Sequence, residues 1–180
     1  MNSETFRSRV SALIKKSRKA LRLYSSMGRL QSHEHSELSE MQIREWQEVN
    51  SELSEQLSSA LESRYTRRLA SNVFLLRDRF YSRWRETEAE AHLKQRELIS
   101  ASEKGEFIKA TLLGRELVVL KARKQACQAA HNELQELIER SKLTPPQVQH
   151  QEDSGKQQKD KGKPVKSAVV IPLRRKDGSS

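Results

Sequence analysis

The sequence predicts an all-α protein, an elongated antiparallel helical hairpin or coiled coil in which one long central helix is flanked by two shorter helices. Three observations predict this class. All four prolines lie beyond residue 144, so no proline interrupts the first 142 residues. Apolar residues recur there in steps of three and four, the spacing of one helix face. With 34% hydrophobic and 32% charged residues, the chain lacks the apolar content of a thick globular core.

Residues 1–30 are expected to form a basic amphipathic helix. Its apolar face begins at Phe6 and continues to Met27 at helical spacing, while lysines and arginines occupy the opposite face. The segment has eight basic residues and one acidic residue, a net charge of +7. Residues 31–62 have eight glutamates and one arginine, a net charge of −7. We therefore expect the first helix to pack on this acidic segment and to neutralise it.

The second helix is predicted over residues 36–103, a stretch without glycine or proline. Ser36 is a candidate N-cap, and the apolar seam continues from Leu38 to Leu98. A helix of this length would extend about 100 Å at ~1.5 Å per residue. It needs a partner along most of that length, because intrinsic propensity rarely holds such a helix together in water.

Gly105 is predicted to be the corner between the long helix and a return helix over residues 105–142. A glycine there can take the left-handed conformation that ends a helix, and Phe107 can staple the next one. Gly105, Glu106, Phe107 and Ala110 resemble the turn between the two helices of a tetratricopeptide repeat. The repeat array itself is rejected, since no second copy follows at a period of about 34 residues.

Two alternatives to this hairpin stay open. The first is a single straight rod that tolerates the glycine, because a helix interior accepts glycine at a cost of about 1 kcal/mol. The second is a dimer in which the same helices pair between two chains.

Residues 143–180 are predicted to be a disordered basic tail, because they contain too few apolar residues to fold alone. A short motif at residues 165–176 combines apolar side chains with arginines. It is expected to bind a protein partner by adding a strand to the edge of a sheet. A basic targeting signal and a solubilising extension are the alternatives. The candidate contacts are Val169, Val170, Ile171, Leu173, Arg174 and Arg175.

Catalytic motifs are absent from the sequence, which has neither a glycine-rich phosphate loop nor a nucleophile-elbow or zinc-protease pattern. Cys127 is the only cysteine, which excludes an intrachain disulfide. Together with His131 it supplies two ligands, whereas a structural zinc site needs four. We predict a protein that is not an enzyme and holds no cofactor or metal ion, with Cys127 buried in the hairpin seam.

Arginines crowd the middle of the predicted long helix and suggest a second function. Basic helices attract phosphate groups through counterion release. Most aromatic residues among them fall on the apolar seam, with Tyr81 the clear exception. Asp78 and nearby glutamates interrupt the patch, so a mixed solvated face is the competing interpretation. The candidate nucleic-acid contacts are Arg64, Arg67, Arg68, Arg77, Arg79, Arg83 and Arg85.

We therefore expect a non-enzymatic adaptor or structural protein that binds protein partners through its helical rod and its tail motif. The alternative is a nucleic-acid-associated protein that uses residues 64–85 and the basic tail. In size and helical habit the chain is similar to the two-helix antiparallel rods associated with bacterial flagellar and type III export ATPases. That likeness is one of shape, without a matching motif, and implies an export-apparatus stalk or chaperone.

The sequence also carries expectations about location. No apolar run approaches the ~20 residues of a membrane span. A cytoplasmic protein is expected, with a nuclear or nucleoid-associated one as the alternative. The basic, serine-rich N-terminus overlaps in character with organelle transit peptides, an interpretation that we rank below these two.

Overall fold

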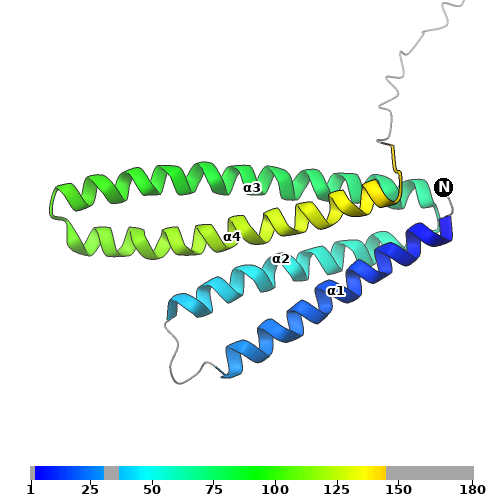
Figure 1. Cartoon of the computed structure of the whole chain (residues 1–180), viewed down its shortest axis with the longest axis horizontal. Coiled ribbons are helices and arrows are strands. Elements are labelled where there is room, and N and C mark those ends of the chain that lie inside the picture. Colours follow the sequence, from blue (N-terminus) through cyan, green and yellow to red (C-terminus); the bar gives the residue numbers. More distant parts are fainter. Residues whose placement is uncertain (1–2, 31–36, 145–180) are drawn as a thin grey trace, which may run out of the picture. The chain divides into compact units, whose positions relative to one another are not determined.

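Four helices make up the part of the chain that the computed structural model describes, residues 3–30 and 37–144. They are α1 (Ser3–Leu30), α2 (Glu37–Glu62), α3 (Thr66–Glu103) and α4 (Phe107–Arg140), and no strand occurs among these residues (Figure 1). The predicted all-α class is confirmed. The helices belong to one unit, residues 1–146. The candidate cap Ser36 and the tail motif lie outside the described residues.

The predicted single helix over residues 36–103 is wrong, because the chain reverses direction at residues 63–65. Tyr65 is extended there, with φ −93° and ψ 116°. Arg83, near the middle of the helix that follows, returns to the side of α2 and forms ion pairs with Glu48 and Glu52. The stretch 36–103 therefore holds two antiparallel helices, α2 and α3, joined by a three-residue turn (Figure 1).

A side chain from α1 explains how α2 can end without glycine or proline. The guanidinium of Arg7 donates hydrogen bonds to the backbone carbonyls of Leu61 and Ser63. The last carbonyls of a helix have no partner within the helix, so a cation that binds them stabilises the end. The partner comes from 54 and 56 residues earlier in the chain. No local sequence pattern could reveal this turn.

The four helices form two antiparallel hairpins, α1–α2 and α3–α4, which contact each other chiefly through α2 and α4 (Figure 1). In the first hairpin the rings of Tyr24 and Trp46 lie 6.0 Å apart. In the second the rings of Trp84 and His131 lie 6.0 Å apart. The expected pairs of helices are therefore present. They lie beside each other rather than end to end along one central rod.

The hydrophobic core lies where all four helices meet. Its side chains come from every helix, and the largest that are fully buried are aromatic or branched. Burying each such side chain contributes about 1.5–3 kcal/mol. The central members are Phe6 and Val10 of α1, Val49 and Leu57 of α2, Leu69, Val73 and Phe80 of α3, and Leu134 of α4.

Both α3 and α4 are followed by a residue with a positive φ. Gly105 has φ 74°, and the backbone N–H groups of Gly105 and Glu106 donate to the carbonyls of Ser102 and Ala101. This is the hydrogen-bond pattern of a Schellman cap. At the end of α4 the same pattern places Lys142 at φ 49° and brings Leu143 onto the core. Leu143, predicted as the first residue of the tail, therefore belongs to the folded unit.

The predicted staple at Phe107 is not formed. Phe107 is 76% exposed, so it does not pack as a staple at the start of α4. The expected neutralisation of α2 by α1 is also not the arrangement found. Helix α1 does pack on α2, but the ion pairs of α2 go to the other hairpin. They join Glu37 to Arg115, Glu45 to Arg123, Glu48 to Arg83, and Glu52 to Arg79 and Arg83.

Candidate interaction surfaces

The seven arginines predicted to contact nucleic acid divide into two groups. Four of them bind other side chains of the protein. Arg83 bridges two glutamates of α2, at 2.5 and 2.8 Å, and Arg79 reaches one of the same pair at 3.1 Å. Arg85 binds Glu88 at 2.6 Å on its own helix. Arg77 binds Asp78 at 2.6 Å and lies 5.2 Å from the centre of the Phe74 ring.

The other three, Arg64, Arg67 and Arg68, are exposed and have no ion-pair partner among the described residues. They lie at and just after the turn between α2 and α3, beside Tyr65, whose side chain is 74% exposed. We call Arg64, Tyr65, Arg67 and Arg68 the turn patch. Ion pairs thus offset the charge of four arginines, of which Arg79 and Arg85 stay exposed, and leave a smaller group of unpaired arginines at the end of the helical unit.

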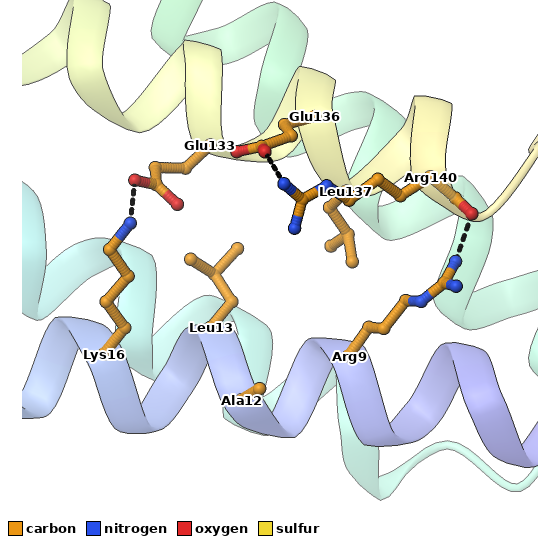
Figure 2. A pocket seen from close by; sticks show the side chains of 8 residues that line it. All are labelled: Arg9, Ala12, Leu13, Lys16, Glu133, Glu136, Leu137 and Arg140. Atoms are coloured by element: carbon orange, nitrogen blue, oxygen red, sulfur yellow. Dashed lines mark hydrogen bonds and ion pairs between the residues drawn. The ribbon is translucent and has the colours of Figure 1, made fainter.

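A shallow groove separates α1 from α4 (Figure 2). It has a volume of about 350 Å³, and Leu13 and Leu137 face each other across it. Its rim is charged, and every charge has a partner. Lys16 binds Glu133, Arg9 donates to the backbone carbonyl of Arg140, and the Arg140 guanidinium binds Glu136. The charged groups of the groove are thus paired with one another across its rim and along α4.

The one thiol of the chain is protected. Cys127 is fully buried, as predicted, and burial raises the pKa of its thiol to about 11. A protonated, buried thiol is a poor nucleophile and a poor metal ligand. His131 instead packs against Tyr81 and Trp84, with ring centres 5.4 and 6.0 Å away. Within residues 3–30 and 37–144, no group of three ligand side chains could hold a metal ion.

Exposed apolar side chains gather at the far end of the α3–α4 hairpin. Glu37, the first residue of α2, pairs with Arg115 at 3.6 Å, so the part of α4 before Arg115 extends beyond the start of α2. We define the hairpin tip by its exposed apolar residues, Ile99, Phe107, Ile108 and Leu112. Ile108 is 83% exposed and Leu112 is 54% exposed. The sequence pattern assigns Phe107 to the turn and gives no sign of this surface.

Helical geometry indicates which side of α4 the tip residues Ile108 and Leu112 occupy. They precede Ala126 and Ala130 by 18 residues, about five turns at roughly 3.6 residues per turn, and therefore lie on the same side of the helix. Ala126 and Ala130 are buried and line a small cavity with Val49 of α2. The side of α4 that α2 covers thus continues into the tip, where α2 no longer reaches.

Comparison of the chain with protein-family models, with curated proteins and with solved structures gives no match. Among the helices of the described ranges, none is both long and apolar enough to span a membrane. The tail residues Val169, Val170, Ile171, Leu173, Arg174 and Arg175 fall outside those ranges, and their role in partner binding stays a prediction.

Proposed function

We propose that this protein is a non-enzymatic helical adaptor whose hairpin tip binds an amphipathic helix of a partner protein. The exposure of Ile108 and Leu112 carries the proposal. Proteins in water rarely leave neighbouring large aliphatic side chains exposed, and such patches commonly mark protein–protein contacts. Laying the apolar face of a helix on an apolar surface is a standard mode of recognition.

The packing of α2 against α4, further along the same side of α4, indicates which kind of partner helix would fit the tip. There, α2 presents apolar residues toward the alanines of α4 and sends glutamates to its arginines. Glu45, for example, binds Arg123 through two hydrogen bonds of 2.7 and 3.0 Å. Lys109 and Arg115 lie next to the exposed aliphatic pair on α4, and their exposed ion pairs with Glu106 and Glu37 leave them open to further carboxylates. A partner helix with an apolar stripe and flanking carboxylates would continue the packing that α2 begins.

The fully folded chain offers a matched test. A photo-crosslinking amino acid at position 108 identifies the partner in cells, and the same label at Leu75, 68% exposed on α3, serves as the control. Binding of the purified partner is then measured by calorimetry. We expect Ile108→Asp with Leu112→Asp to weaken it at least tenfold, and Leu75→Asp to leave it unchanged.

Two results would contradict the proposal. If Val170→Asp with Ile171→Asp abolishes binding while the tip variant does not, the tail motif is the site. If the crosslinked species is a second copy of this chain, the tip mediates self-association and not adaptor function. Sedimentation of the unlabelled protein distinguishes that case, because the tip variant would then lower its mass.

A further inference from the structure

The turn patch has the composition of a site for an anionic ligand. Its three arginines are exposed within five consecutive residues, and the adjacent Tyr65 ring is in no aromatic pair among the described residues. The arginines between residues 77 and 85 of α3 are bound to carboxylates, as Arg83 is to Glu48 and Glu52. Within the described ranges, the four arginines of residues 77–85 therefore have ion-pair partners, whereas the three at the turn have none.

The surroundings of the turn patch add positive potential. The first turn of α3 carries no acidic residue, and its N-cap residue Tyr65 makes no side-chain cap hydrogen bond at this positive end of the helix dipole. Arg7 lies beside the turn, bound to the carbonyls at the end of α2. The exposed Glu62 is the carboxylate nearest in sequence, and it offsets only one of the three arginines.

The last turn of α4 lies near the turn patch. Arg9, two residues after Arg7, donates to the carbonyl of Arg140 in the last turn of α4. The end of α4 therefore lies at the end of the unit that carries the turn between α2 and α3. Residues 145–180, which follow, contain eight basic and four acidic residues.

We propose that the turn patch binds single-stranded nucleic acid, with Arg64, Arg67 and Arg68 on the phosphates and Tyr65 stacked on a base. Guanidinium groups match phosphate oxygens in geometry as well as in charge. An acidic protein would satisfy the arginines but would leave the exposed ring without a role. Single-strand binding proteins combine a basic surface with aromatic side chains on which unpaired bases stack. This inference goes beyond the adaptor function and uses a different end of the molecule.

The test uses the full chain and a fluorescent oligo-dT of about 20 nucleotides, a length that spans several stacking sites. Anisotropy is measured at about 50 and about 200 mM salt, since phosphate contacts make affinity fall steeply with salt. The turn variant is Arg64→Ala, Arg67→Ala and Arg68→Ala. Its control is Lys15→Ala, Lys19→Ala and Arg22→Ala, which removes the same charge from exposed positions of α1.

We expect the turn variant to weaken binding at least tenfold and to reduce the slope of log affinity against log salt by about 2, or ~0.7 for each phosphate that is no longer neutralised. The control should have a clearly smaller effect. Tyr65→Ala should weaken binding several-fold, whereas Tyr65→Phe should retain it. Equal reductions in the two triple variants, or no effect of Tyr65→Ala, would overturn the proposal. Displacement of the oligonucleotide by polyglutamate as effectively as by unlabelled oligo-dT would overturn it in favour of an acidic protein ligand.

Discussion

Arg123 of α4 and Glu45 of α2 form an ion pair with two hydrogen bonds, 2.7 and 3.0 Å long, that joins the two helical hairpins. The carboxylate is largely buried, with only 10% of its side chain exposed, while Arg123 is one-third exposed. The hydrogen bonds to Glu45 raise the pKa of Arg123, so its guanidinium stays protonated. Opposite charges on different hairpins thus help to specify how the hairpins dock.

This pair predicts a specific loss of stability. Arg123→Ala would leave the Glu45 carboxylate buried without its cation. We expect a loss of about 1–3 kcal/mol in the free energy of unfolding, below the roughly 3–5 kcal/mol of fully buried pairs because Arg123 is partly solvated. Arg115→Ala, which removes an exposed pair with Glu37, is the control and should change stability by less than about 0.5 kcal/mol. Urea titration measures both, and similar losses would refute the role of the inner pair.

Gly105 and Gly114 give opposite predictions for the same substitution. Gly105 has φ 74°, where a side chain is strained even though no atom lies within 4 Å of the place that a Cβ would occupy. Gly105→Ala should therefore destabilise the protein by about 1–2 kcal/mol. Gly114 lies inside α4 with open space around it, so Gly114→Ala should stabilise the protein by about 0.5–1 kcal/mol. Thermal unfolding of the two variants would contradict the turn geometry if both moved in the same direction.

Burial of Cys127 predicts both its reactivity and a pH dependence. Burial raises the thiol pKa from 9.0 to about 11, so between these values the unfolded chain loses a proton that the folded chain retains. Stability from this group is complete below pH 9 and is lost as the pH rises through about 11. The wild type should lose stability over that range more steeply than Cys127→Ala. Labelling of the native thiol at neutral pH should be far slower than in urea, and equal rates would show that the thiol is accessible.

The all-α class and the pairing of the helices could be predicted from the sequence. Apolar spacing is a local signal, and a glycine such as Gly105 is itself the residue type that a tight turn needs. The turn at residues 63–65 could not be predicted, because its stabilising partner, Arg7, is distant in the chain. The charge balance correctly identified α2 as an acidic helix. It wrongly predicted that the basic residues of α1 are the ion-pair partners of the α2 glutamates. The arginines of α3 and α4 reach those glutamates only because the chain reverses before α3 begins.

The surfaces were harder to predict than the helices. Ile108 and Leu112 have the spacing of seam residues, and only the shorter length of α2 leaves them uncovered. Arg64 and Arg83 look alike in the sequence, yet one is exposed and the other binds two glutamates. Which apolar or charged residues stay open to water depends on the relative lengths and directions of the helices, and these are tertiary properties.

Both proposed surfaces depend on the reversal of the chain at residues 63–65. Spin labels on cysteines at the exposed positions Glu40 of α2 and Glu90 of α3, in a Cys127→Ala background, test it by pulsed electron paramagnetic resonance. Two antiparallel helices packed in one unit place the labels about 10–25 Å apart. A continuous helix would separate them by about 75 Å, at ~1.5 Å per residue. We expect the short distance, unchanged when labelled chains are diluted with unlabelled ones. A distance near the ~75 Å of the continuous helix, or a short one that disappears on dilution, would contradict it.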